Sequence, residues 1–526
     1  MENKNISNNI EKKAEEKIKE NIEENIINKD YKNATSLYNR LVAYSETEVY
    51  PFHMPGHKRN SKILNMANPY DIDITEIDDF DNLHNANDII LNLMEKISKY
   101  YETKKSFVLV NGSSCGILAA ISAATVYNKN ILVGRNCHKS VYNAILVNRL
   151  NATYVYPKYN KNIETFEDIE AEEIERSLYE SRESGHKIGT IVITSPTYEG
   201  VVSDIDKISE IAKKYDCTLI VDEAHGAHFS GSDYFPKSSI KRGADIVIHS
   251  VHKTLPSLTQ TALLHICNDR VNEKVIEKYL SVYESSSPSY VLMASVDRCF
   301  SLLNKCGKEL FLKYTKRLDN LLISLKELKN IEIYNGCEFN KREKDISVFD
   351  RCKVDGRKFD RSKIVIYGKK HRLSGKKLYD ILLNKYKLQM EMASTYYVIG
   401  MTSICDTDEG FRRLISALKE IDEDSKTMEY LSSDLGENNE INLIPKKKYS
   451  MFEAEEMEKI TIDIKDATGK VAGDAVYLYP PGSPIIVAGE IYSQEIIYKI
   501  IFSIESGLNV LGTKGKNVII VSEKVN

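Results

Sequence analysis

Four groups of residues that could take part in one reaction occur in order along the chain. They are the turn Gly112-Ser113-Ser114, the histidine His138, the carboxylate Asp222 and the amine Lys253. A glycine turn that opens a helix offers free N–H groups to an anion, and the two serines add hydroxyls. A carboxylate beside a ring nitrogen can keep that nitrogen protonated. A lysine becomes nucleophilic toward an aldehyde when burial lowers its pKa from about 10.4.

Each group is ordinary when taken singly, because helix caps are commonly serine and surface lysines and histidines abound. Together they match the separate needs of pyridoxal phosphate. We expect the Gly112-Ser113-Ser114 turn to bind the phosphate and Asp222 to pair with the pyridine nitrogen. Lys253 would hold the aldehyde as a Schiff base, and His138 would stack on the ring. His225, three residues after Asp222, could reach the phenolic oxygen of the ring or the substrate.

The elements that position these residues are apolar runs that alternate with helical patterns. Continuous apolar strands separated by helices predict an α/β fold with a parallel or mixed sheet covered on both faces. In such sheets ligands bind at the carboxyl ends of strands, where Gly112, Asp222 and Lys253 fall. The predicted strands are Ser106–Asn111, Ile131–Gly134, Ile188–Thr194, Cys217–Asp222, Asp245–Ser250 and Thr261–Ile266, and the predicted helices are Cys115–Tyr127, His138–Leu150 and Ile205–Tyr215.

Changes of composition along the 526 residues predict several domains. Residues 1–34 are rich in Glu, Lys, Asn and Ile and are expected to form a charged extension, solvated or weakly helical. The arm and large domain are expected at 35–300, and a smaller α+β domain with long charged helices such as Lys308–Lys329 at 301–425. A polar linker at 426–447 and a small C-terminal domain at 448–526 complete the prediction.

Bulk properties exclude several classes of protein. The formal net charge is −4 and the pI about 6.3, so neither nucleic acid nor an anionic membrane is an expected partner. Nine cysteines without a C-x-x-C spacing favour a reducing cytoplasm and argue against a zinc knuckle. The first 20 residues lack an apolar core, so no signal peptide is expected. Ile117–Val126, the most apolar window, is too short to span a bilayer.

Beyond these four groups, the sequence resembles the Orn/Lys/Arg decarboxylase family, which are fold-type I pyridoxal-phosphate enzymes, in the short form without an N-terminal wing domain. The resemblance covers about residues 36–526, and its most specific stretches are SVHKTLPSLTQ and VDEAHG. The matching stretches are PFHMPGHK at 51–58, DDFDNLH at 78–84, NGSSCG at 111–116, 135–140, SPTYEG at 195–200, VDEAH at 221–225, 250–260, 285–297 and YPPGSPIIVAGE at 479–490.

The resemblance implies a fold-type I large domain and a homodimer or larger assembly with active sites at the dimer interface. It implies decarboxylation of a basic amino acid, arginine, lysine or ornithine, to CO2 and an amine of polyamine metabolism. Ser250 and His252 would also contact the phosphate, and Ser287 would approach the neighbouring subunit's cofactor. Glu391 would bind the distal cation of the substrate. Lys253 or His252 would return the proton to Cα.

The sequence departs from the family in two places. Relatives more often have Gly-Thr-Ser at the turn where this chain has Gly112-Ser113-Ser114, and the hydroxyl is kept. The charged extension before residue 35 has no counterpart.

Four other functions fit the sequence less well. An aminotransferase or aldolase of the same fold would need the same cofactor residues, and the YPPGSP and HMPGHK stretches favour the decarboxylase. Residues 222–225 spell DEAH, but no Gly-Lys followed by Ser or Thr provides a nucleotide-binding loop. A metal site is not expected, because Pro55-Gly56 prevents a helix from presenting His53 and His57 together. A non-catalytic relative would not need an intact Lys253.

Overall fold

The computed structural model describes residues 36–160, 165–334, 359–369, 373–424, 444–480 and 482–522. The chain divides into two compact units, Met1–Tyr50 and Pro51–Asn526. In the first unit, helix α2 (Leu37–Ser45) begins after Ser36, whose hydroxyl accepts a hydrogen bond from Asn39 N–H. The predicted extension at 1–34 and most of the predicted linker at 426–447 lie outside the described residues.

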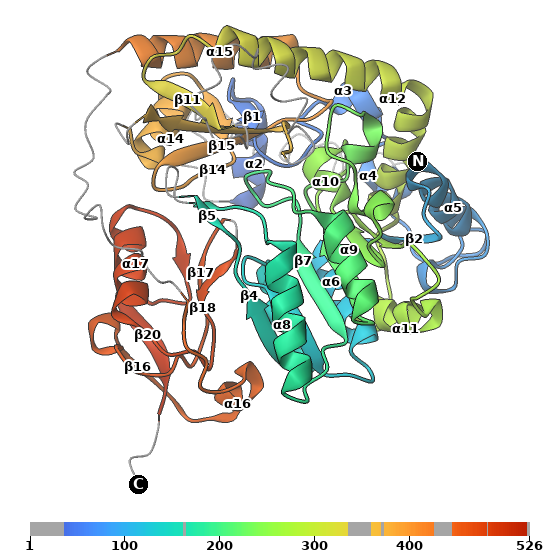
Figure 1. The fold of residues 1–526 in the computed structure, drawn as a ribbon. Helices are drawn as coiled ribbons and strands as arrows, with labels where there is room; N and C mark the ends of the chain where they lie inside the picture. The colour runs from blue at the N-terminus through green and yellow to red at the C-terminus, as the bar shows by residue number, and fades with distance from the viewer. Residues whose placement is uncertain are drawn as a thin grey trace, which may run out of the picture. The chain divides into compact units, whose positions relative to one another are not determined.

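A seven-stranded sheet forms the centre of the second unit, in the order β2-β10-β9-β8-β7-β3-β4 (Figure 1). Strands β9, β8, β7, β3 and β4 pair in parallel, while β10 runs antiparallel to β9 and β2. The predicted α/β fold with a mostly parallel sheet is therefore confirmed. The strands are β2 (Lys105–Leu109), β3 (Asn130–Gly134), β4 (Asn151–Val155), β7 (Thr190–Thr194), β8 (Thr218–Asp222), β9 (Ile246–His249) and β10 (Ala262–Ile266).

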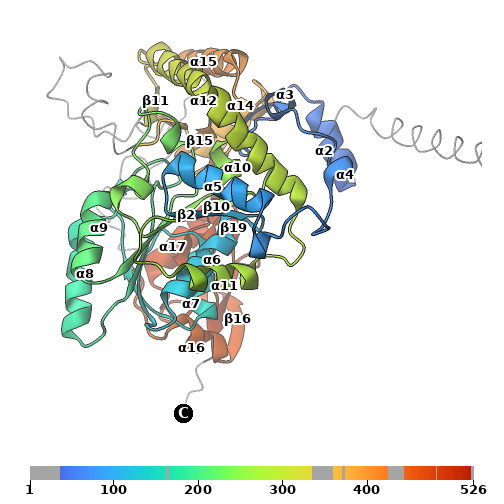
Figure 2. The same cartoon turned by 90° about the vertical axis from the view of Figure 1, so that its right-hand side faces the viewer.

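Helices cover both faces of this sheet. Helices α8 (Ala171–Glu183) and α9 (Ile205–Lys214) lie on one face, and α6 (Gly112–Ala124), α7 (Lys139–Val147) and α11 (Glu273–Tyr283) on the other (Figures 1 and 2). Helix α6 can approach the sheet closely because it is rich in small residues. A Cβ at Gly116 would lie 2.6 Å from Leu109 Cδ1.

The predicted elements are present, with shifted ends. Helix α6 begins at Gly112, three residues before the predicted start, because Gly112 itself turns the chain with φ +76°. Strand β4 was not predicted. The turn before it is made by Arg149 at φ +53°, so no glycine marks it in the sequence.

A long helix, α12 (Tyr290–Ser324), follows the large sheet and kinks at Cys306, which has φ −140°. The predicted helix Lys308–Lys329 is its second part, and the predicted domain border at residue 300 falls inside it. Helix α12 packs on α15 (Asp408–Glu423), which belongs to a second, smaller region.

That smaller region is an antiparallel sheet in the order β11-β12-β15-β14, with helices packed on it. Its strand β12 begins with a buried lysine and continues with apolar residues. The elements are β11 (Ile331–Tyr334), β12 (Lys363–Gly368), α14 (Gly375–Asn384), β13 (Leu388–Met390), β14 (Met392–Ala393) and β15 (Tyr397–Met401).

The C-terminal region has its own apolar core around Ile464, Ile496 and Val518. A buried ion pair joins it to the large sheet, because Arg135 Nη2 lies 2.9 Å from Glu490 Oε2 and both side chains are at most 5% exposed. The elements are α16 (Met451–Glu456), β16 (Lys459–Asp463), β17 (Val476–Leu478), β18 (Pro484–Ile486), α17 (Gln494–Glu505), β19 (Val510–Leu511) and β20 (Asn517–Val521).

Shorter elements connect these regions. No helix within the described ranges has both the length and the apolarity to cross a bilayer. The remaining elements are β1 (Tyr50–Phe52), α3 (Ser61–Leu64), α4 (Pro69–Ile72), η2 (Leu83–Asn85), α5 (Ile89–Tyr101), β5 (Tyr159–Asn160), β6 (Thr165–Phe166), η3 (Phe229–Gly231), η4 (Ser239–Arg242), α10 (Val251–Thr254) and η6 (Ile464–Asp466).

Two ion pairs between the large domain and the C-terminal region, Arg135–Glu490 and Arg149–Glu456, allow a matched stability test. Glu490→Gln leaves the buried guanidinium of Arg135 without its counter-charge, so we expect the free energy of unfolding to fall by about 3 kcal/mol. Glu456→Gln breaks the Arg149–Glu456 pair, whose side chains are both 59% exposed, and should cost less than about 1 kcal/mol. Thermal and urea unfolding of both variants would measure this, and equal losses would contradict it.

Candidate functional site

The residues predicted to share one reaction meet at the carboxyl edge of the large sheet. Asp222 ends β8 and pairs in register with Thr194, which ends β7, and with Ile248 of β9. Lys253 lies in the short helix α10, which begins directly after β9 and Ser250. Adjacent parallel strands therefore bring the carboxylate and the amine to the same edge.

The amine of Lys253 lies in a low-dielectric environment. Its Nζ is 3.1 Å from His225 Nε2. Burial lowers the pKa of Lys253 below that of a free lysine, and the charges of Asp222 and Glu391 only partly oppose that shift. A lowered pKa increases the fraction of neutral amine, which is the form that attacks an aldehyde.

Asp222 is shifted in the opposite direction. It is 4% exposed, and its Oδ1 accepts a hydrogen bond from Ala224 N–H at 3.1 Å. Burial raises the pKa of Asp222, although the charge of Lys253 works against the rise. A buried carboxylate of this kind would be stabilised by a cationic ring nitrogen beside it.

His225 and His138 both remain neutral at physiological pH. Burial holds the pKa of His225 well below 6.5, and its Nδ1 has no hydrogen-bond partner among the described residues. Its ring lies edge-on to that of Tyr198, with centroids 4.8 Å apart.

Burial, followed by the charge of Lys253, lowers the pKa of His138 to about 3. His138 caps α7, and its Nδ1 accepts a hydrogen bond from Ser140 N–H at 3.3 Å.

The predicted phosphate-binding residues come from two helix starts. At α6 the N-cap Asn111 makes no side-chain hydrogen bond to the first turn, so the N–H groups of Ser113 and Ser114 are not capped by it. At α10 the hydroxyl of Ser250 is fully buried and has no hydrogen-bond partner within the described ranges. A phosphate oxygen would satisfy these donors.

His252 also belongs to the α10 start. Its Nδ1 donates to Thr261 O at 2.8 Å, and burial lowers its pKa to about 4. The neutral ring therefore presents a bare lone pair at Nε2. It could accept a proton there, but it could donate to a phosphate only as an imidazolium.

The two remaining predicted residues, Glu391 and Ser287, differ in their relation to this group. Glu391, between β13 and β14, accepts hydrogen bonds from Tyr198 Oη at 2.7 Å and from Met54 N–H at 2.8 Å. Tyr198 also lies edge-on to His225, which connects Glu391 to the residues around Lys253. Ser287 lies exposed between α11 and α12 and has one described hydrogen bond, from its N–H to Ser285 Oγ. The structure thus does not bring Ser287 to Lys253 within one chain.

Sequence reasoning missed several residues of the site. Tyr198 and Met54 lie in stretches noted for their resemblance, yet neither was assigned a role. Gly482 also lies in such a stretch, and the structure places it against His138, where an added Cβ would be 3.1 Å from the ring carbon Cδ2. Lys363 was not noticed, although a lysine opening an apolar strand is a signal that could have drawn attention.

The site fits pyridoxal phosphate on grounds of its own chemistry. Asp222 would hold the ring nitrogen, Lys253 the aldehyde carbon, and the α6 and α10 starts the phosphate. The orphaned Ser250 hydroxyl and the orphaned His225 Nδ1 are hydrogen-bonding groups that such a ligand would satisfy. The neutral ring of His138 offers a flat face for stacking.

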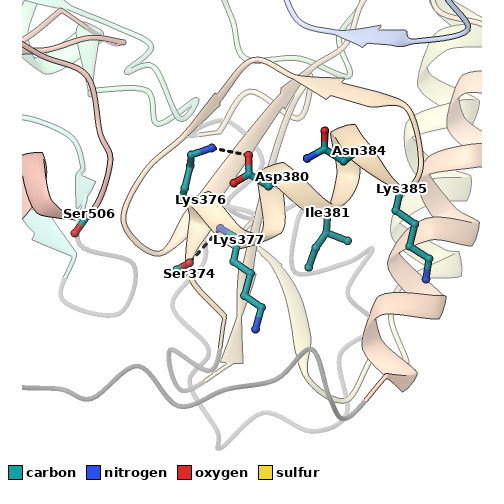
Figure 3. A pocket seen from close by; sticks show the side chains of 8 residues that line it. All are labelled: Ser374, Lys376, Lys377, Asp380, Ile381, Asn384, Lys385 and Ser506. Atoms are coloured by element: carbon teal, nitrogen blue, oxygen red, sulfur yellow. Dashed lines mark hydrogen bonds and ion pairs between the residues drawn. The ribbon is translucent and has the colours of Figure 1, made fainter. Parts of the chain in front are cut away.

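An open groove of about 600 Å³ lies elsewhere, on α14 and beside Ser506 (Figure 3). It is lined by three lysines, but Lys376 pairs with Asp380 at 2.5 Å and Lys385 with Glu420 at 2.6 Å. These cations are matched by carboxylates of the same surface, and none of the predicted site residues lines the groove.

Comparison with known proteins connects this geometry to a family. The family model for the Orn/Lys/Arg decarboxylase major domain matches residues 35–352, and that for the C-terminal domain matches residues 427–507. The chain is 31% identical to the uncharacterized protein YaaO of Bacillus subtilis, over 93% of this chain and 99% of that protein. It is 28% identical to the arginine decarboxylase of the same organism, over 91% and 96%.

Among solved structures, the constitutive lysine decarboxylase of E. coli superposes with a TM-score of 0.70 at 18% identity. The match covers 92% of this chain and 81% of that one. At this identity the likeness shows a shared fold.

The contact between Gly482 and His138 predicts an effect on cofactor retention. Gly482→Ala introduces a Cβ against the His138 ring, so we expect the Kd for pyridoxal phosphate to rise roughly tenfold. Gly469→Ala is the matched control, because Gly469 also has a positive φ (+76° against +88°) but no atom within 4 Å of an added Cβ. Titration of the apoenzyme, followed by visible absorbance, would measure both. An unchanged Kd in Gly482→Ala would contradict the role given to His138.

Proposed function

The chain belongs to the Orn/Lys/Arg decarboxylase family, and we propose that it converts arginine or lysine to CO2 and the corresponding amine, which feeds polyamine metabolism. Ornithine is the third substrate to test. The enzyme is a pyridoxal-phosphate-dependent amino-acid decarboxylase. The observation that carries the proposal is the complete set of Lys253, Asp222, His225 and His138 at one sheet edge, in a chain that matches the family in both of its domains.

When bound, pyridoxal phosphate supplies an electron sink for the pair released as the bond between Cα and the carboxylate breaks. Asp222 keeps the ring nitrogen charged. Its carboxylate is buried, so its attraction for that charge is weakly screened. His225, held neutral, can orient the Lys253 amine from 3.1 Å and still has Nδ1 for the ring oxygen or the substrate.

Proton transfer to Cα has two candidate donors in this chain. Lys253 would hold the cofactor aldehyde and would be a free amine while substrate is bound there, and burial favours its giving up a proton. His252 Nε2 is the second candidate, but it would first have to take up a proton, because Nδ1 donates to Thr261 O and burial lowers the pKa of the ring to about 4. Both residues lie in α10.

Selectivity for a basic substrate is assigned to Glu391. Tyr198 Oη donates to one oxygen of Glu391 and Met54 N–H donates to the other. These two donors come from separate segments of the chain, and together they fix the orientation of the carboxylate. A carboxylate has lone pairs left after two hydrogen bonds, so it can also accept from an ammonium or a guanidinium.

Incubation with arginine, lysine, ornithine and norleucine tests the substrate class. We expect CO2 and the matching amine from arginine or lysine, and at least a 100-fold lower kcat/KM for norleucine, because it lacks the distal cation and leaves Glu391 unpaired (roughly 3 kcal/mol). Release of a keto acid without CO2 would overturn the proposal.

The same assay should be run on a matched pair of variants. Asp222→Asn should lower kcat roughly 1,000-fold, because the ring nitrogen loses its anionic partner. Asp216→Asn changes an 82% exposed carboxylate and should leave kcat as it is.

We also propose that the enzyme is a homodimer, or a larger assembly of dimers, in the cytoplasm. Ser287 supports the first point, since it is exposed in the single chain, and the family resemblance places it near the partner's cofactor. Seven described cysteines are free thiols, which suits a reducing compartment. Cell fractionation tests the location.

Subunit mixing tests the dimer. Chains carrying Lys253→Ala and chains carrying Ser287→Trp should each be inactive alone. Co-expressed, they should recover about a quarter of the activity, because half the dimers are mixed and each mixed dimer has one intact site. Full activity of Ser287→Trp alone would contradict a role for Ser287 in the neighbouring site.

A further inference from the structure

Three lysines with restricted solvent access belong to the region of the proposed site, and among the described residues one of them, Lys363, has no hydrogen-bond partner. Lys58 Nζ donates to His53 O and to Met401 O, both at 2.7 Å. Lys253 Nζ lies 3.1 Å from His225 Nε2. Lys363 is 1% exposed, and its Nζ has no hydrogen-bond partner within the described ranges. A buried ammonium in this state is costly, which points to a missing anion.

The nearest carboxylate does not satisfy Lys363. Asp360 Oδ2 is 3.6 Å from Nζ, beyond hydrogen-bond distance, and it already accepts from Ser362 Oγ at 2.8 Å. The other oxygen of Asp360 lies 3.0 Å from His228 Nε2. Asp360 therefore gives Lys363 a counter-charge that it shares with other donors.

Lys363 packs against the loop that carries Tyr198, whose ring contacts His225. It opens β12, and its Cγ lies 3.1 Å from where a Cβ of Gly200 would be, so the chain packs against the stem of the side chain. Asp360 N–H donates to Gly200 O at 2.7 Å, which anchors the start of β12 to the loop after β7. The charge of Lys253 lowers the pKa of Lys363, and the charge of Lys363 lowers that of His225.

We propose that Lys363 is the cation that binds the α-carboxylate of the amino-acid substrate. The assignment rests on the proposed function, because it takes the substrate to be an α-amino acid held at Lys253. Burial is the main cause that lowers the pKa of Lys363, to about 8, so at pH 7 the ammonium is mostly charged. An α-carboxylate would supply the missing acceptor, while Glu391 would hold the other end of the substrate.

In this role Lys363 would contribute more to substrate binding than to the rate of decarboxylation. The negative charge leaves the carboxylate as neutral CO2 forms, so the attraction to Lys363 is stronger in the bound substrate than in the transition state. Loss of Lys363 should therefore raise KM more than it lowers kcat.

The test compares each amino acid with its α-carboxamide, argininamide or lysinamide, which keeps the amine and the distal cation but not the carboxylate. Apparent Kd values come from the cofactor absorbance in the first milliseconds after mixing with the holoenzyme, before CO2 is released. The wild type should bind the acid at least about 30-fold more tightly than the carboxamide, as expected for a buried charge-assisted hydrogen bond.

In Lys363→Met the acid should lose roughly 30- to 100-fold in affinity and the carboxamide less than about threefold. Lys376→Met, on the open groove, is the control and should change neither Kd. Equal losses for acid and carboxamide would show a structural role and overturn the proposal. The proposal would also be overturned if the wild type bound the acid and the carboxamide equally well. That result does not depend on whether a variant folds. Discrimination without CO2 release would count against the decarboxylase function and leave the assignment of Lys363 standing.

Discussion

The site depends on two oppositely charged groups at the same edge of a sheet, a buried carboxylate and a partly buried amine. The carboxylate of Asp222 and the amine of Lys253 attract each other, yet burial shifts the pKa of both toward the neutral form. Asp222 has a raised pKa, so its burial costs folding stability at every pH above the unfolded value near 3.9. Lys253 has a lowered pKa, so its burial costs stability at every pH below about 10.4. Both costs are present at neutral pH.

A bound cofactor would offset both costs and so would tie function to stability. A protonated ring nitrogen would pair with Asp222, and a bond to the aldehyde would replace the free ammonium at Lys253. Ligands that bind only the folded state stabilise it by mass action. The surrounding fold holds Asp222 and Lys253 in place, because β7, β8 and β9 end at the same edge of the sheet and helices cover both of its faces. The C-terminal region, fixed by the Arg135–Glu490 pair, packs Gly482 against His138.

The sheet and the residues at its strand ends could be predicted from the sequence because both leave local patterns. Apolar runs mark β7, β8 and β9; Asp222 ends β8, and Lys253 lies in α10 just after β9. The parts that could not be predicted come from remote segments. Tyr198 and Glu391 meet because the fold brings the loop after β7 to the end of β13, and no sequence periodicity connects them. Lys363 looks like any lysine at the start of a strand until its burial is known.

The contribution of the neighbouring subunit could not be predicted for a different reason. Ser287 resembles a family position, but the single chain leaves it on the surface, so its role depends on an assembly that one sequence does not encode locally. The choice of substrate also depends on geometry that the sequence does not encode locally. The distance from Lys253 to Glu391 is set by packing between the large sheet and the smaller one, and not by the spacing of residues along the chain.

The central claim is that Lys253 is the residue that holds the cofactor. Borohydride reduction of the purified enzyme, followed by proteolysis and mass spectrometry, identifies the modified lysine directly. We predict a single pyridoxyl-phosphate group on the peptide that contains Lys253, with the visible absorbance band lost on reduction. A group on Lys363 or Lys58 instead, or no modified peptide from an enzyme that carries the absorbance band, would contradict the account.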